Sequence, residues 1–163
     1  MPDITRAGKS KSRAIAGFLR QIWASTFESK LDRGTIEKVV KACFDDDAIK
    51  RQIGDDAWVF LVAGEQEGPV IGMLNAKLEH SAIIVNRLYV DAASQGRGIG
   101  SALLKEIKKY FPGADRFILE VIDNNDKAIG FYEHRGFKKM GKNIMAIEEV
   151  VLNVFVMEKE IKH

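Results

Sequence analysis

The sequence predicts one α/β domain in which helices flank a mixed β-sheet. Helical periodicity dominates the first third of the chain, whereas strand-like apolar runs begin at Ala57. Later, a strand, a glycine-rich turn, an amphipathic helix and a second strand follow one another, which implies a parallel pair joined by a right-handed crossover. Because the 163 residues contain no repeat and no long linker, we expect a single domain over residues 1–163.

The first third of the chain predicts three helices. Ser10 or Ser12 is expected to cap the first of them. Its apolar stripe at helical spacing consists of Ile15, Phe18, Leu19, Ile22 and Trp23. A second helix is expected from Thr35, and the acidic run 45–47 suits the cap and first turn of a short third helix.

The middle of the chain predicts a meander of strands, an order that favours antiparallel pairing. Residues 57–63 form the first apolar run, residues 65–69 have turn chemistry, and a second strand starts at Val70. Residues 82–90 are apolar on both faces, which suggests a central position in the sheet.

The last third of the chain predicts one more helix and three strands. Residues 117–122 form the strand that follows the crossover helix. Asn124-Asn125-Asp126 predicts the cap of the helix, which reaches about Arg135 and ends at Gly136. A short strand after this glycine and a long strand at 150–157 complete the chain.

Composition and charge narrow the classes of partner. The chain is 46% apolar and 29% charged with a net charge of +2, and its basic residues are mostly interleaved with acids, so we expect no nucleic-acid partner. No apolar run approaches the length of a membrane span and the N-terminus lacks a signal-peptide core, so we expect no membrane partner. Cys43 has no cysteine to pair with, which favours a reducing cytoplasm and a buried apolar role.

The segment Gln95-Gly96-Arg97-Gly98-Ile99-Gly100 is the most informative part of the sequence. It precedes an amphipathic helix that Pro112-Gly113 ends. Glycines allow a ligand to approach the backbone, and free amides at the start of a helix favour an anion. The turn therefore suits a pyrophosphate, with Arg97 as a nearby cation, although such turns are also common as plain connectors.

Two other nucleotide sites fit this turn less well. A P-loop needs a lysine before its serine, whereas Gly100 is followed directly by Ser101. A Rossmann site needs G-x-G-x-x-G, and the spacing here is G-x-G-x-G. Glu120 does lie about 20 residues downstream, as a ribose-binding acid would. Too few residues follow the turn to complete a doubly wound sheet, so this site stays a minor alternative.

Three segments together resemble the GNAT superfamily of acetyl-coenzyme A-dependent N-acetyltransferases. Gln95-x-x-Gly98-x-Gly100 resembles its coenzyme signature and Arg87-Leu88-Tyr89-Val90-Asp91 its central strand. Asn125-x-x-Ala128-x-x-Phe131-Tyr132-Glu133-x-x-Gly136-Phe137 resembles its second signature. The resemblance implies a strongly twisted mixed sheet of about seven strands, with central parallel strands splayed in a V that holds the coenzyme.

The resemblance also implies the coenzyme-binding residues. They are Leu88, Tyr89, Val90, Gln95, Gly96, Arg97, Gly98, Ile99, Gly100, Ser101, Asn125 and Tyr132. The strand 88–90 would pair with the pantetheine arm as an added strand does, and one of its amides would polarise the acetyl carbonyl. Lys127 and Arg135 are candidates for contact with the outer phosphate. No metal is expected.

Tyr132 is the expected catalytic residue. A phenol with a pKa of about 10 stays protonated at neutral pH, while a departing thiolate with a pKa near 8.5 needs a proton. The base for the amine stays open. Many relatives use a glutamate near the central strand, but Asn86 and Arg87 stand there. Three other candidates remain, namely Glu28, Glu79 and His80.

A fainter resemblance concerns the acceptor. Trp23-x-x-Thr26-Phe27-Glu28, and the ending from Gly136 to Lys159, are similar to bacterial and archaeal polyamine (spermidine/spermine) acetyltransferases. This implies transfer to a polyamine-like primary amine by direct attack in a ternary complex. Protein N-termini, lysines, amino-sugar antibiotics and a non-catalytic coenzyme-binding module stay open as alternatives, and a homodimer is one option for the assembly.

Overall fold

The computed structural model describes residues 1–163 and contains one seven-stranded sheet. Its strand order is β1-β2-β3-β4-β5-β7-β6, and every neighbouring pair is antiparallel except β4 and β5. The strands are β1 (Ile4–Arg6), β2 (Trp58–Ala63), β3 (Gly72–Glu79), β4 (Ala82–Val90), β5 (Arg116–Ile122), β6 (Lys138–Ile147) and β7 (Val150–Glu160). The predicted mixed sheet with a central parallel pair is confirmed.

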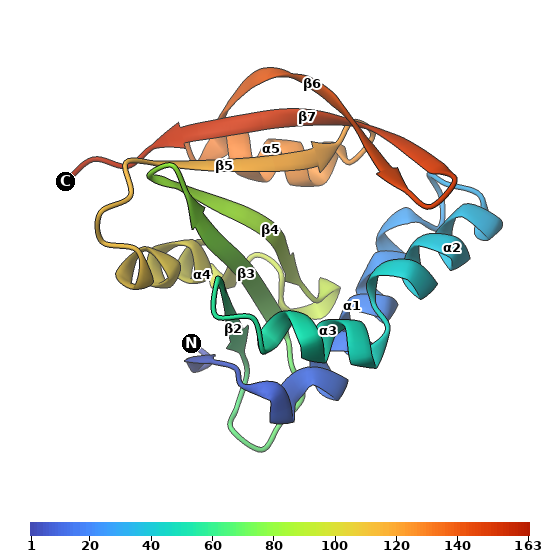
Figure 1. Ribbon diagram of the computed structural model, residues 1–163, viewed down its shortest axis with the longest axis horizontal. Coiled ribbons are helices and arrows are strands. Elements are labelled where there is room, and N and C mark those ends of the chain that lie inside the picture. Colours follow the sequence, from blue (N-terminus) through green and yellow to red (C-terminus); the bar gives the residue numbers. More distant parts are fainter.

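Five helices cover the two faces of the sheet, and the sheet separates two apolar cores (Figure 1). They are α1 (Ser12–Phe27), α2 (Arg33–Cys43), α3 (Asp46–Ile53), α4 (Ile99–Ile107) and α5 (Asp126–His134). Apolar side chains of α1, α2 and α3 form one core with one face of the sheet, and those of α4 and α5 form the other core. The alternation of side chains along each strand supplies both cores.

The helix caps follow the predictions only in part. Asp45 caps α3 as expected, but α1 has no side-chain cap, so the prediction of Ser10 or Ser12 is wrong. The reason is that a 3-10 turn leads directly into α1, so no extended cap residue precedes it. Helix α2 begins at Arg33 rather than Thr35, because the Asp32 carboxylate accepts a hydrogen bond from the Thr35 amide at 2.9 Å.

Three strands differ from the predictions, and two of them, β1 and β6, lie at the edges of the sheet. Strand β1 was not expected, and it pairs only three residues with β2. Strand β3 begins at Gly72 rather than Val70. The strand after Gly136 was expected to be short, yet β6 has ten residues. It is an outer strand that is exposed along most of its length, so it lacks the apolar alternation that marks half-buried strands.

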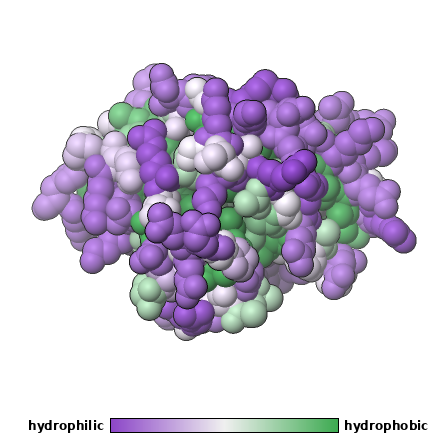
Figure 2. Space-filling view, turned by 90° about the horizontal axis from the view of Figure 1, so that it is seen from below, coloured by the Kyte–Doolittle hydropathy of each residue, from purple (hydrophilic) through white to green (hydrophobic).

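The surface in view is mostly polar, as expected for a chain that is 29% charged. Figure 2 shows a largely hydrophilic face on which apolar side chains are visible between polar ones. None of the helices has the length and the apolar character needed to cross a bilayer.

A β-bulge at the centre of the sheet separates the two parallel strands. Val85 pairs with Ala76 and Arg87 with Asn75, which leaves Asn86 without a partner on β3. Strands β4 and β5 pair only from Ala82 and Arg116 to Val85 and Leu119. Beyond that point β4 stays with β3 and β5 with β7, so the two strands diverge toward α1 and α2 (Figure 1).

Candidate functional site

The gap between β4 and β5 leaves a strand edge without a partner. From residue 87 to residue 90, β4 pairs with β3 on one side and with no strand on the other, and Asn86 at the bulge pairs with neither neighbour. The main-chain N–H and C=O groups on that open side need partners. An extended ligand with amide groups would supply them, as an added strand does.

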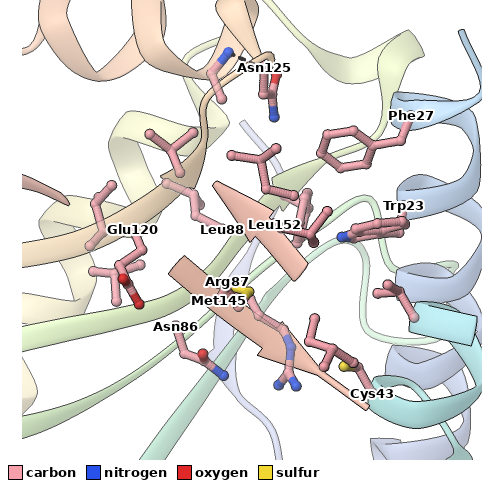
Figure 3. Close-up of a pocket in the computed structure, with 18 of the residues that line it drawn as sticks. Trp23, Phe27, Cys43, Asn86, Arg87, Leu88, Glu120, Asn125, Met145 and Leu152 are labelled. Atoms are coloured by element: carbon pink, nitrogen blue, oxygen red, sulfur yellow. Dashed lines mark hydrogen bonds between the residues drawn. The ribbon is translucent and has the colours of Figure 1, made fainter. Parts of the chain in front are cut away.

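A cavity of about 150 Å³ lies in this gap. One wall comes from α5 and its cap, with Asn125, Ala128 and Tyr132. The opposite wall comes from α1 and the end of α2, and Figure 3 shows Trp23 and Phe27 on that side, across from Asn125. The gap therefore joins the two faces of the sheet, so two reactants can approach each other from opposite sides.

The structure brings together four of the predicted coenzyme residues. Leu88, Tyr89, Asn125 and Tyr132 all line the cavity. Val90 lies next along β4 but does not line it, and residues 95–101 form a separate turn at the end of that strand. A ligand that touched both groups would have to be long, with its reactive end in the cavity.

The glycine turn has the backbone that an anion site requires. Gly96 and Gly98 have φ values of 82° and 81°, in the left-handed region that favours glycine. Helix α4 has no side-chain cap, and its first main-chain bond runs from the Ala102 amide to the Gly98 carbonyl. The amides of residues 99–101 therefore lack protein partners and carry the positive end of the helix dipole.

Gly100 is needed for a different reason. A Cβ atom placed there would lie 2.8 Å from Cζ of Phe131. The glycine therefore allows α4 and α5 to touch, and it couples the turn to the helix that carries Tyr132. Gln95 also has a structural part, because its side-chain amide donates to the Val90 carbonyl at 3.0 Å and closes the loop after β4.

Arg135 is held beside the start of α4. Its Nε donates to Oγ of Ser101 at 2.6 Å, and its guanidinium lies 3.6 Å from the centre of the Phe131 ring. Arg97 and Lys127 are exposed and make no ion pair. Of the three candidate cations, Arg135 is the one that the protein holds in place beside the helix start.

Tyr132 lies at the end of the cavity nearest α5. Its ring packs edge-on against Phe131 and Phe137, each at 5.2 Å between ring centres. Burial raises the pKa of its phenol, and Tyr89 adds to the effect. The hydroxyl is protonated and has no protein hydrogen-bond partner, so it is free to donate to a ligand. Asn125 caps α5 by accepting from the Ala128 amide at 3.3 Å, which leaves its NH₂ group free.

The structure changes the list of candidate bases. Glu79 and His80 lie at the tight β3–β4 turn, about 20 Å along β4 from Leu88 at the rise of a strand. Glu28 is exposed at the end of α1. Glu120, considered from sequence only as a ribose ligand, is instead the one carboxylate that lines the cavity, and it accepts from Asn143 at 3.2 Å.

Arg87 is a second residue whose place at the cavity the sequence did not predict. It lines the cavity on the α1–α3 side, where its Nη1 donates to Oε1 of Gln52 at 2.6 Å. In β5 the alternation of side chains puts Glu120 on the face opposite the buried apolar residues of that strand. The bulge that turns Arg87 inward has no marker in the sequence.

Comparisons with known proteins agree with this geometry. Residues 18–137 match the model of the acetyltransferase (GNAT) family. The PaiA N-acetyltransferase of Thermoplasma acidophilum, solved with coenzyme A, has a TM-score of 0.86 at 21% identity over 99% of both chains. A GCN5-related N-acetyltransferase of Rhodopseudomonas palustris has a TM-score of 0.81 at 20% identity, over 99% of this chain and 96% of that one.

A plant protein shows the same architecture. Arabidopsis thaliana NAA60, solved with a bisubstrate analogue, has a TM-score of 0.74 at 16% identity, over 99% of this chain and 100% of its own. At such identities these structures establish the likeness of fold, and the family match covers most of the chain.

Proposed function

The chain belongs to the GNAT family of acetyltransferases, which use acetyl-coenzyme A, and on this premise we propose that it acetylates the primary amine of a small molecule by direct attack in a ternary complex. One observation carries the proposal. The unpaired edge of β4 faces a cavity that opens toward both sheet faces and contains a free, protonated phenol. We also propose that residues 1–163 act as one domain.

The proposed coenzyme path follows the open edge of β4. The amides of residues 99–101 would hold the pyrophosphate, and Arg135 would add a positive charge beside them. The main chain of Leu88–Val90 would pair with the pantetheine arm, and the NH₂ group of Asn125 is free to bind the same arm. This path ends at Tyr132, where the sulfur would lie.

The reaction forms a bond between the amine nitrogen and the acetyl carbon, and it breaks the bond between that carbon and sulfur. A main-chain amide of β4 near Leu88 would stabilise the developing oxyanion. Glu120, directly or through a water, would take the proton that the amine loses. Tyr132 would donate to the departing sulfur, and because burial raises its pKa we expect its main effect to be a hydrogen bond that stabilises the thiolate.

The polyamine acceptor is the finer form of this proposal. The resemblance in α1 supports it, but a polycation needs several carboxylates to bind it. Glu120 is the one carboxylate that lines the cavity, and Arg87 places a positive charge on its other side. The charge of the cavity therefore favours an amine with a single cationic group over spermidine or spermine.

The test is an acceptor screen with acetyl-coenzyme A, read by thiol release and by the mass of the product. The panel contains amino acids, polyamines, an amino-sugar antibiotic and a peptide with a free N-terminus. We expect turnover with a small primary amine. Tight binding of the coenzyme without transfer to any amine would instead identify a non-catalytic binding module, and preference for the peptide would identify a protein acetyltransferase.

A further inference from the structure

The β-bulge decides which way Arg87 points. Beyond Asn86 the alternation of β4 resumes, so Leu88 and Val90 pack with the α4–α5 core while Tyr89 packs with the α1–α3 core. Arg87 shares the face of Tyr89, and its side chain accordingly meets α3 and the end of α2. In Figure 3 its guanidinium points toward Cys43, away from Asn125. It therefore lies on the face opposite the proposed coenzyme helices.

The charge of Arg87 has no counter-ion in the protein. None of the ion pairs of the structure includes this residue. Its guanidinium has five N–H donors, and Gln52 is its only hydrogen-bond acceptor. Phe44 contributes an aromatic ring at 5.5 Å, and Asp46, in the first turn of α3, is bonded to Arg20 at 2.9 Å.

This arrangement is costly without a ligand. Desolvation lowers the pKa of Arg87, and the ionisable groups that act on it are the phenol of Tyr89 and the thiol of Cys43, both neutral at pH 7. A partly buried charge normally has an opposite charge beside it. Asn75, which β3 places opposite Arg87, is fully buried and its carboxamide also lacks a partner. Two side chains with unused hydrogen-bonding groups, those of Arg87 and Asn75, thus lie at this point of the sheet.

The rest of this wall is apolar. Its side chains are Trp23, Phe27, Val39, Phe44, Met145, Ile147 and Leu152. On the other side of the bulge, Figure 3 shows Glu120 close to Asn86. The acceptor side of the cavity therefore offers one negative group, one positive group and an apolar surface.

We propose that the acceptor is an amino acid with an apolar side chain, whose carboxylate binds the free donors of Arg87. This rests on the proposed function and names its substrate class. A guanidinium binds a carboxylate through two parallel hydrogen bonds, which fixes the position of the attached amine. The carboxylate provides the missing counter-ion, the apolar wall accepts the side chain, and the amine is left to face Glu120 and the acetyl group.

The test compares acceptors that differ only in the carboxylate. Methionine, leucine and phenylalanine are each paired with the corresponding amide, and thiol release gives kcat/KM for each. We expect the carboxylate form to be preferred by about 10- to 100-fold, the usual worth of hydrogen bonds to a charged group. Equal rates for acid and amide in the wild-type protein would overturn the inference while leaving the acetyltransferase proposal intact.

Variants then assign the preference to Arg87. Arg87→Gln should bring the rates of acid and amide together, chiefly by raising KM for the acid, and Arg87→Lys should keep part of the preference. Arg33→Gln is the matched control, because Arg33 is exposed and pairs with Glu37 away from the cavity. A preference that survives in Arg87→Gln would contradict the assignment. Coenzyme affinity, measured in parallel, reports whether each variant is folded.

Three other results complete the design. Acetylation of a polyamine in preference to every amino acid would overturn the inference. So would a better rate with a peptide whose C-terminus is amidated. Coenzyme binding with no transfer to any amine would refute the proposed function itself, which is a different result from equal rates for acid and amide. If Arg87→Gln does not fold, the wild-type preference still decides the question.

Discussion

Replacing Gly100 by alanine tests how the proposed phosphate turn is coupled to α5, the helix that carries Tyr132. The new Cβ would lie 2.8 Å from Cζ and 3.0 Å from Cε2 of Phe131, so the ring must move by several tenths of an ångström or more. The ring cannot move freely, because the Arg135 guanidinium lies 3.6 Å from its centre and Tyr132 packs against it at 5.2 Å. Overpacking of this kind costs about 1–3 kcal/mol.

The assay is thermal unfolding together with the affinity for coenzyme A. For a chain of this length each kcal/mol lowers Tm by about 2–4 °C. We therefore expect a Tm lower by about 2–12 °C, and weaker coenzyme binding because α4 shifts with its amides. Gly113→Ala is the matched control, since a Cβ there would meet nothing within 4 Å and its φ is unstrained. It should change neither quantity.

A second substitution checks the cause. Phe131→Leu removes the ring atoms that the new Cβ would strike, so the double variant should recover part of the stability lost in Gly100→Ala. Its coupling energy should be favourable, as expected for two residues in contact. A Gly100→Ala protein with wild-type Tm and coenzyme affinity would refute the packing argument. So would a double variant whose losses simply add.

Three further predictions concern Tyr132, Glu120 and Tyr89. Tyr132→Phe should lower kcat by about 10²-fold, in line with the loss of a hydrogen-bond donor to the departing thiolate, while the coenzyme Kd stays nearly constant. Unchanged turnover would remove Tyr132 from catalysis. Glu120→Gln should lower kcat/KM at neutral pH, whereas Glu79→Gln, whose carboxylate pairs with Lys77 outside the cavity, should not; equal losses would exclude Glu120 as the base. Burial raises the pKa of Tyr89 to about 12 and raises that of Tyr132 as well, against about 10 in the unfolded chain. Below pH 10 both phenols are protonated in the folded and the unfolded state, so neither lowers the stability. Above pH 10 the unfolded state loses protons that the folded state keeps. The free energy of unfolding should therefore fall by about 1.4 kcal/mol per pH unit for each tyrosine until its folded pKa is reached. Urea unfolding between pH 9 and 11 measures this slope, which should be flatter in the double Tyr→Phe variant.

The predictable part of the structure is the part with local signals. Strand β4 runs over residues 82–90 as expected, because a tight turn precedes it and a glycine-rich loop follows it. The helix after Asn125 also begins and ends as predicted, since its cap and its terminal glycine are adjacent in sequence. Short-range chemistry of this kind leaves a clear pattern. Such patterns predicted the two segments proposed to hold the coenzyme, the glycine turn 95–101 and the helix of Tyr132, and the second of these lines the cavity.

The acceptor side of the cavity depends on long-range features instead. Glu120 and Arg87 come from different strands, and they meet the cavity only because β4 and β5 separate. That separation begins at one unpaired residue, Asn86, whose identity does not predict a bulge. The sequence could therefore indicate that an amine is acetylated without indicating which groups would bind it.

The β-bulge at Asn86 thus has two consequences that a regular strand could not have together. In a strand of period two, a shift by one residue exchanges the two faces, so an unbroken β4 would turn Arg87 toward α4 and α5 and Leu88 toward α1. The same unbroken strand could continue beside β5 beyond Val85 and would close the gap. Because the bulge both frees the edge that we propose for the coenzyme and turns Arg87 toward the proposed acceptor side, the two proposed sites depend on the same feature of β4. Evolution of a new acceptor preference in this chain would therefore be expected to alter the side chains around Arg87 and to leave the bulge in place.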